Sequence, residues 1–243
     1  KSFPYCFADC TSLRSIPEGL LAGMSAAYEF ESMFANTAIS SVPANLFDEV
    51  RDYDLANYSY IFSECPNLKT VPATLFDHVT DVASDGFNCL FYKSGIETIP
   101  AGLFTSCVNV PATAFETAFM GCPKLKSVEG SIFPETTSVT SMKGLFYNCT
   151  KLESIPADLF KPFGTAKLKF SQTFEGCTSL KSIPEGLFAA NTATTHFAGA
   201  FIDCTSLESV PENLLASCAN LTYVNKMFSG CTSLKTIPEK FFA

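Results

Sequence analysis

The chain has 243 residues, 47% of them hydrophobic and 16% charged, so it can bury a large core. Its net charge of −8 and its pI near 4.8 disfavour nucleic acid and anionic membrane as partners, because both need a basic surface. The sequence contains no run of about 18 apolar residues, so no membrane-spanning segment is predicted. It shows no secretion signal either, but the mature chain of an exported protein would lack one.

One motif recurs along the whole chain and predicts its architecture. In its clearest copy, Phe170 to Phe188, it reads F-x-x-φ-F-x-x-C-x-x-L-x-x-I-P-x-x-L-F, where φ is a small or apolar residue. A period this regular is typical of a solenoid. We therefore expect residues 1–243 to form a single elongated domain of nine coils. The central phenylalanine recurs every 27 to 29 residues, at Phe7, Phe34, Phe62, Phe91, Phe119, Phe146, Phe174, Phe201 and Phe228.

Each coil is predicted to hold a short helix and a short strand, which makes the fold an α/β solenoid. The apolar residues of Phe170–Cys177 stand at i, i+3, i+4 and i+7, which is helical spacing. Leu180–Ile183 then forms a parallel strand, and Pro184 ends it because proline cannot donate to a sheet ladder. A second interpretation places the strand at Phe170–Phe174 instead; it fits the prolines better and the charge pattern worse. With either strand the coils should form a right-handed superhelix.

The repeats differ at few positions along the chain. Repeats 2 and 4 carry Thr37 and Ser94 where others have cysteine, and their next apolar anchor comes one residue early. Repeat 5 has Glu129 where every other repeat has proline, and Pro134 follows later. Repeats 6 to 9 are nearly uniform. Neither end shows the polar cap that terminal coils usually need, so we expect a fragment of a longer protein.

The 11 cysteines follow the repeat rather than a disulfide framework. A column shared by the coils is a packing position, and a free thiol is a good small buried group. Cys107 and Cys218 occupy equivalent places four repeats apart, too far to bond, and Cys6 and Cys89 have no evident partner. We expect all of them to be reduced and mostly buried. The column itself consists of Cys10, Cys65, Cys122, Cys149, Cys177, Cys204 and Cys231.

One column supports a strand at the Leu-x-x-Ile segment. The residue after its leucine or isoleucine anchor alternates in charge from repeat 3 onward, and neighbours in a parallel stack lie roughly 4.8 Å apart, so opposite charges can pair. The next residue is Ser or Thr in every repeat, from Ser15 to Thr236. We expect an exposed face here and treat it as a candidate partner-binding face. Its charged residues are Lys69, Glu97, Lys126, Glu153, Lys181, Glu208 and Lys235.

Tyrosines supply a second candidate face. Most of the 24 phenylalanines fall on repeat columns and are therefore core. Tyr53, Tyr58 and Tyr60 instead gather just before repeat 3, and Tyr92, Tyr147 and Tyr223 also lie off the core columns. Tyrosine favours interfaces because it combines a large ring with a polar group. The alternative, that these rings only cover the edges of the core, stays open.

Residues for catalysis or metal binding are sparse. His78 and His196 lie in predicted loops of non-adjacent coils, without Cys or carboxylate at metal-ligand spacing. The three aspartates of 48–54 surround Arg51 but lack the glycine and distal glutamate of a calcium loop. Nucleotide-binding and nucleophile motifs are also missing. We therefore expect no enzyme, no cofactor and no metal.

The residues Phe146–Pro156, F-Y-N-C-T-K-L-E-S-I-P, resemble the BspA-like leucine-rich repeats of bacterial surface proteins. Ser138–Met142 is similar to the related repeat of bacterial surface lipoproteins. The resemblance covers the whole chain, although the family's common repeat is shorter, so the chain looks like a longer-period relative.

The resemblance implies a leucine-rich-repeat superhelix that is extracellular or anchored at the cell surface. It implies an adhesion protein whose partner is a protein or glycan on a host or bacterial surface. Because the sequence shows no active site, we expect a non-enzymatic protein, and we expect it to be a monomer. The alternative is a structural spacer that presents a flanking module, and a less favoured third is an accessory enzyme with its site in the loops. The family has no shared ligand residues to transfer.

Overall fold

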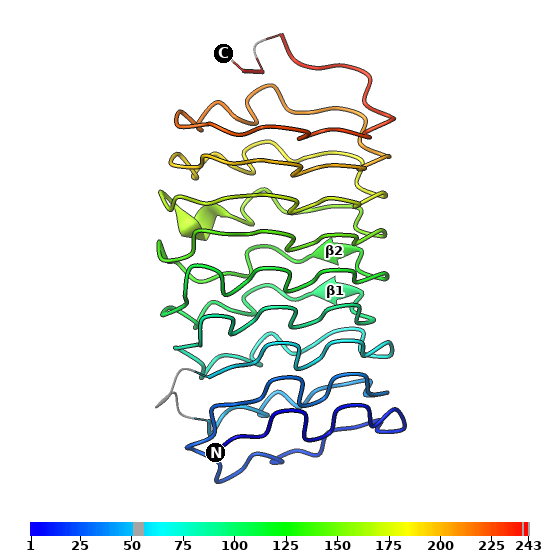
Figure 1. Ribbon diagram of the computed structural model, residues 1–243, viewed down its shortest axis with the longest axis vertical. Helices are drawn as coiled ribbons and strands as arrows, with labels where there is room; N and C mark the ends of the chain where they lie inside the picture. Colours follow the sequence, from blue (N-terminus) through cyan, green and yellow to red (C-terminus); the bar gives the residue numbers. More distant parts are fainter. Residues whose placement is uncertain (51–55, 240, 243) are drawn as a thin grey trace.

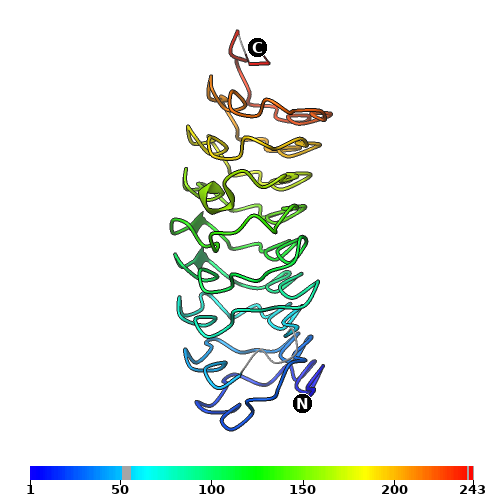
Figure 2. The same ribbon diagram turned by 90° about the vertical axis from the view of Figure 1, so that its left-hand side faces the viewer.

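The computed structural model is an elongated stack of coils and describes residues 1–50, 56–239 and 241–242. In Figure 1 the coils lie one above another from the N-terminus to the C-terminus, and Figure 2 shows the same stack turned by a quarter. The solenoid that the repeat predicts is therefore observed. The number of coils and their handedness stay predictions.

Regular secondary structure is scarce. The described residues contain strand β1 (Thr98–Ile99), strand β2 (Ser127–Val128) and the 3-10 helix η1 (Lys161–Phe163). The strands pair in parallel with their first residues opposite each other, and both lie on the Leu-x-x-Ile segment where a strand is predicted. No α-helix occurs in this part of the chain, so the predicted short helices are wrong.

Overlapping turns replace the predicted helix. In Phe170–Cys177, the N–H groups of Gln172 and Gly176 donate to carbonyls of the next coil. The N–H groups of Thr173 and Cys177 donate to the carbonyls three residues back. Gln172 and Gly176 have φ of 57° and 75°, the positive values that the third residue of such a turn requires. A helix would keep all these N–H groups inside one coil, so it competes with the stacking of coils.

The turn segments form a continuous ladder between coils. The N–H groups at positions 170, 172, 174 and 176 donate to four carbonyls of the next coil at 2.8 to 2.9 Å. The same pattern joins Phe3–Asp9 to Glu29–Ala35 near the N-terminus. Both interpretations of the sequence are therefore right in part, because pairing occurs at both segments. We name the F-x-x-φ-F-x-x-C side (Phe170–Cys177 and its equivalents) the turn edge, and the Leu-x-x-Ile-Pro side (Leu180–Pro184 and its equivalents) the strand edge.

Proline keeps the strand edge short. It follows the isoleucine or valine in every repeat except the fifth, and it has no N–H to continue a ladder. In the fifth repeat the Glu129 N–H donates to Ile99 O at 2.9 Å. This bond explains why β1 and β2 reach strand length, whereas Ser182 and Ser209 on the same edge form only an isolated bridge.

Stacked aromatic rings fill the interior between the edges. The central phenylalanines stack pairwise from Phe7 to Phe228, with ring centroids 5.2 to 6.1 Å apart. A parallel column stacks Phe76 on Phe104 at 5.6 Å. Each such pair contributes about 0.5–1.5 kcal/mol beyond the burial of its area. The prediction that the repeat phenylalanines form the core is confirmed.

The cysteine column is also structural. All 11 cysteines are free, and all but Cys6 and Cys10 are buried, as the sequence predicts. Six thiols of the column donate to the carbonyl of the central phenylalanine one coil back, at 3.0 to 3.2 Å. Thr37 provides a hydroxyl at the same place and donates to Phe34 O at 2.9 Å. Burial raises the pKa of Cys231 to about 11, so this thiol stays protonated.

Candidate interaction surfaces

The charged row of the strand edge is joined by three ion pairs. One Glu97 carboxylate oxygen lies 3.4 Å from Lys69 Nζ, and the other lies 3.8 Å from Lys126 Nζ. Lys235 Nζ donates to a Glu208 carboxylate oxygen at 2.9 Å. This hydrogen bond and the positive charge lower the pKa of Glu208. The predicted pairing of alternating charges is confirmed at these residues, and it leaves the row almost neutral.

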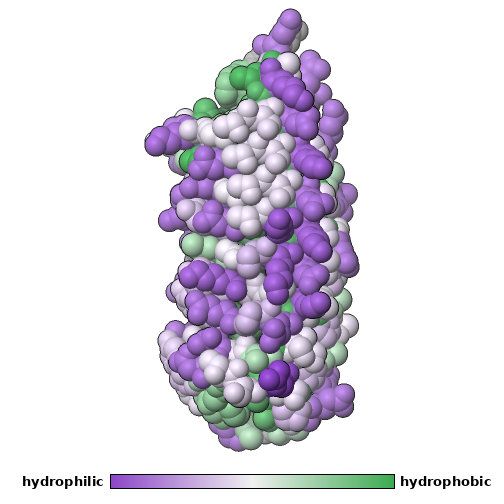
Figure 3. All heavy atoms as spheres, turned by 90° about the vertical axis from the view of Figure 1, so that its right-hand side faces the viewer, coloured by the Kyte–Doolittle hydropathy of each residue, from purple (hydrophilic) through white to green (hydrophobic). Residues whose placement is uncertain are grey.

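Figure 3 shows the side of the stack on which β1 and β2 lie. Hydrophilic side chains line it, and a pale stripe of intermediate hydropathy runs along its C-terminal half. The hydroxyl column here is exposed, for example at Ser182 and Ser209. Glu153 and Lys181 also lie on this edge, but among the described residues no ion pair joins either to the row. This face offers hydrogen-bonding groups without a dominant anchor.

The three tyrosines before repeat 3 do not form one surface. Tyr53 lies outside the described residues. Tyr58 is 0% exposed, and its ring stacks between Phe30 and Phe87 at 5.3 and 5.7 Å. Its place in a partner-binding face is therefore a wrong prediction, because the position four residues before the central phenylalanine points into the core. Tyr60 is 39% exposed and does lie at the surface.

Tyr60 belongs to a row of large side chains on the turn edge. Tyr92, Met120 and Tyr147 each follow the central phenylalanine in three successive repeats, and all three are half-buried. The rings of Tyr60 and Tyr92 meet edge to face with centroids 6.5 Å apart. We name these four residues the tyrosine row. The sequence signal for Tyr92, Met120 and Tyr147 is the recurrence of large side chains directly after the central phenylalanine, whereas Tyr60 stands two residues before Phe62.

Neighbouring groups hold the tyrosine row in place. Lys93 Nζ lies 4.8 Å from the centroid of the Tyr92 ring and 3.8 Å from a Glu64 carboxylate oxygen. A hydrogen bond with Cys89 and, as a smaller cause, burial raise the pKa of Tyr60 to about 12. Tyr60 therefore keeps its phenolic proton at neutral pH.

Two hollows of about 610 and 420 Å³ adjoin each other on the loops that follow the strand edge. They share Asp158 and Lys161 among their lining residues. We name the pair the loop groove. Its lining includes Val108, Ser131, Glu135, Asp158, Lys161 and Glu185.

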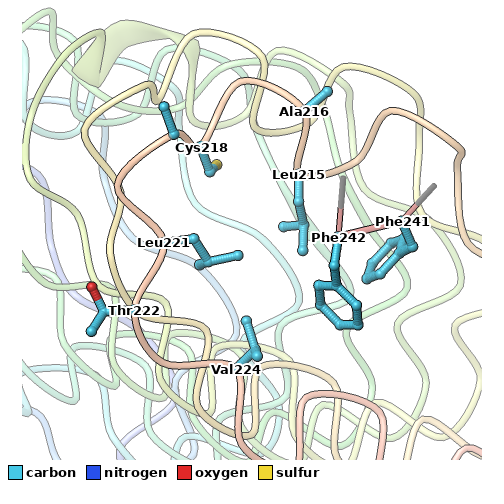
Figure 4. A pocket seen from close by; sticks show the side chains of 9 residues that line it. Leu215, Ala216, Cys218, Leu221, Thr222, Val224, Phe241 and Phe242 are labelled. Atoms are coloured by element: carbon cyan, nitrogen blue, oxygen red, sulfur yellow. The ribbon is translucent and has the colours of Figure 1, made fainter.

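A third hollow, of about 540 Å³, lies near the C-terminal end of the stack (Figure 4). Apolar side chains surround it, among them Leu215, Leu221 and Phe241. Phe242 also lines it and is 70% exposed. The hollow is continuous with the aromatic core, since the Phe228 and Phe241 rings are in edge contact at 5.9 Å.

The described residues hold no cluster suited to metal chemistry. Within them no group of three or more His, Cys, Asp or Glu side chains could hold a metal ion. His78 Nε2 lies 3.9 Å from a single carboxylate oxygen of Asp48, and the His196 ring stacks on Tyr223 at 4.3 Å. The rest of the predicted aspartate loop falls in 51–55, outside the described residues. No helix in the part of the chain that the structure describes is long and apolar enough to cross a membrane.

Comparison with known families gives one clear match. The family model described as BspA type leucine rich repeat region matches residues 84–159 and 113–235, more than half of the chain, with six copies. A comparison with curated proteins finds no match.

Several solved structures are similar in fold. A leucine-rich repeat protein from Bacteroides ovatus is 18% identical with a TM-score of 0.40, covering 96% of this chain and 74% of that one. A leucine rich cell surface protein from Faecalibacterium prausnitzii is 21% identical with a TM-score of 0.31, covering 96% and 61%. The leucine-rich repeat domain of the type III effector XopL is 16% identical with a TM-score of 0.38, covering 94% and 61%. The chain thus spans less than two thirds of the last two, and at these scores the likeness supports no functional argument.

Proposed function

Because the chain belongs to the BspA-type leucine-rich repeat family, we propose that it is a non-enzymatic protein of the cell surface or extracellular space that binds a macromolecular partner. Proteins with leucine-rich repeats typically bind other proteins, and members of this family are typically found at the cell surface. The partner is a protein or glycan on a host or bacterial surface.

The tyrosine row is the observation that carries this proposal. Tyr60, Tyr92, Met120 and Tyr147 gather on neighbouring coils of the turn edge, where most other outward positions are small or polar. Large aromatic side chains dominate the binding energy of interfaces, and methionine adapts its shape to a partner. A partly exposed row of such residues supports recognition rather than packing alone.

The charged row contributes to the rate and specificity of binding and not to its main energy. Its lysines and glutamates are mostly exposed, for example Lys69 and Lys235 with 69% and 72% of their side chains accessible. Charges at the rim of an interface change the rate and specificity of association more than its affinity. We therefore place the energetic centre of binding on the turn edge and not on this row.

The alternative function is a spacer that presents a flanking module. The stacked central phenylalanines favour it, because they run without interruption from Phe7 to Phe228 and stiffen the body along its length.

The test is an array of host extracellular proteins, bacterial surface proteins and glycans, probed with the purified chain. A triple variant, Tyr60→Ala, Tyr92→Ala and Tyr147→Ala, is compared with the wild type on every ligand that binds. We expect its affinity to fall by roughly tenfold or more, since loss of one hot-spot residue already costs about 2 kcal/mol.

Tyr223→Ala is the matched control, because Tyr223 is 52% exposed and lies directly before the turn edge of the ninth repeat. This variant should bind as the wild type does. If the triple variant keeps its affinity, or the control loses as much, the tyrosine row is not the binding surface. A wild-type chain that binds nothing on the array favours the spacer.

A further inference from the structure

We propose that the loop groove is a second binding site, which takes an extended protein segment that carries lysine or arginine between small apolar side chains. The site is distinct from the tyrosine row and goes beyond the function proposed above. Its partner follows from the shape and charge of the groove.

The groove begins where the array loses its regularity. In most repeats proline starts a turn that is closed by a backbone bond, as in Pro156–Leu159 and Pro184–Leu187 at 3.3 and 3.4 Å. Glu129 replaces that proline in the fifth repeat, and the residues after it follow a series of bends beside the fourth repeat. The Gly102 N–H accordingly donates to Ser131 O at 2.9 Å. Departures from an otherwise consistent local pattern concentrate at functional sites.

This irregular path leaves a polar group without a partner among the described residues. The Ser131 side chain lines the groove, and its hydroxyl is buried with no hydrogen-bond partner among the described residues. Buried hydroxyl groups are nearly always hydrogen bonded in folded proteins. This hydroxyl is closed off from the groove surface, so a peptide in the groove would contact the exposed lining around it.

The charges around the groove are mainly negative. Glu135, Asp158 and Glu185 are exposed along it, and Lys161 is the only cation in the lining. Within the described residues no ion pair joins Lys161 to these carboxylates. Three carboxylates against one ammonium are complementary to a cationic side chain. The net charge of −8 on the whole chain also favours a basic partner, as the charges of the groove do.

The floor of the groove is apolar and its length fits a short peptide. Val108 is 46% exposed, and Ala157, Ala189 and Ala190 lie near the other end. The rings beneath, from Phe104 to Phe188, are stacked at steps of 5.9 to 6.3 Å. Three such steps match roughly five residues of an extended chain, which rises about 3.3 Å per residue.

Other occupants fit less well. The one aromatic ring in the lining, Phe133, is 1% exposed, so a sugar ring would find no surface for stacking. Nucleic acid and a second copy of this chain both carry net negative charge and would be repelled.

The test uses a fluorescein-labelled peptide of seven residues in which valine alternates with lysine. The intact chain is titrated into this peptide, and binding is measured by fluorescence anisotropy. A peptide with glutamate in place of lysine is the ligand control. We expect saturable binding of the lysine peptide that weakens as salt is raised, and no binding of the glutamate peptide. Peptide binding should also slow hydrogen exchange in 105–108, 131–135 and 157–162. Equal binding of both peptides, or competition by a neutral oligosaccharide such as cellohexaose, would overturn the proposal.

Matched variants locate the site. Asp158→Asn with Glu185→Gln should lower the affinity by roughly tenfold, because both carboxylates face the bound cation. Glu18→Gln with Glu212→Gln removes the same charge, and both residues occupy the column of Glu185 outside the groove. This control should change the affinity less than about twofold. Equal losses in both variants would show attraction by net charge only and would sink the proposal.

The tyrosine triple variant separates this site from the proposed function. It should bind the lysine peptide as the wild type does, whatever the array shows. If it loses peptide binding, the peptide occupies the tyrosine row and the loop groove is not a site.

Discussion

The turn edge and the strand edge pair the same coils in different ways. At the turn edge, Phe170–Cys177 sends every second N–H to the next coil, and the N–H groups of Thr173, Glu175 and Cys177 close turns within the coil. At the strand edge, Pro184 stops the ladder after a single bridge. A residue without an N–H, or one that tolerates positive φ, therefore decides which edge carries the continuous ladder. The edges also differ in what they leave free, since the turn edge presents tyrosines and the strand edge presents paired charges.

The largest loss of stability is expected from a substitution in the core beneath the turn edge. Phe174 is 0% exposed and stacks on rings of both neighbouring coils. Phe174→Ala should lower the free energy of unfolding by about 3–5 kcal/mol, because it leaves a cavity in the column. Chemical denaturation measures this. The control Phe242→Ala, at a side chain 70% exposed, should change it little, and equal effects would contradict the assigned core.

A smaller loss of stability is expected when Glu129 on the strand edge is replaced by the proline that the other repeats carry. Glu129→Pro removes the N–H that donates to Ile99 O and should cost about 1–3 kcal/mol, because the carbonyl loses its partner. Glu129→Gln keeps the N–H and serves as the control, with stability near that of the wild type. If both variants denature alike, the backbone bond is not what lengthens β1 and β2.

The thiols of the turn edge give a prediction about reactivity. Only Cys6 and Cys10 of the 11 cysteines are exposed, and burial raises the pKa of Cys177 and Cys204. The thiolate is the reactive form, so a disulfide reagent at pH 8 should modify two thiols quickly and the rest only after denaturation. Fast reaction of Cys177 or Cys204 in the native chain would contradict the buried column.

The smallest effect is expected at the charged row of the strand edge. The pKa of Glu208 is lowered by its hydrogen bond and ion pair with Lys235. The pair therefore stabilises the fold fully above the unfolded pKa of Glu208, and this contribution is lost as pH falls through the lowered value. Glu208→Gln should remove that part of the acid dependence of unfolding. Glu153→Gln should leave it unchanged, and the same shift in both variants would argue against the pair.

The sequence predicts the stack of coils well, because the same period and the same apolar positions recur in every repeat. It predicts the wrong local structure at the turn edge, because tight turns and a helix place the same apolar residues inward. A signal was available: the residue before the cysteine position is Gly, Asn or Asp in most repeats, as in Asn36, Asn148 and Gly176. These residues tolerate the positive φ observed there.

The candidate surfaces are less readable from the sequence. Tyr58 and Tyr60 are two residues apart, yet one is buried and the other exposed, because the turns direct their side chains differently. The loop groove depends on how the fifth repeat pairs with the fourth after Glu129, which spacing alone does not reveal. The charge alternation of Lys69, Glu97 and Lys126, in contrast, is visible in the sequence because it involves one column of the stack.

Native-state hydrogen exchange tests most directly that the turn edge carries the continuous ladder. The amides of Gln172 and Gly176 donate to the next coil, and so do their equivalents along the stack. These amides should exchange only with global unfolding, while the amides of Ser182 and Ile183 on the strand edge exchange faster. Fast exchange at Gln172 and Gly176, or equal protection of the two edges, would contradict this account.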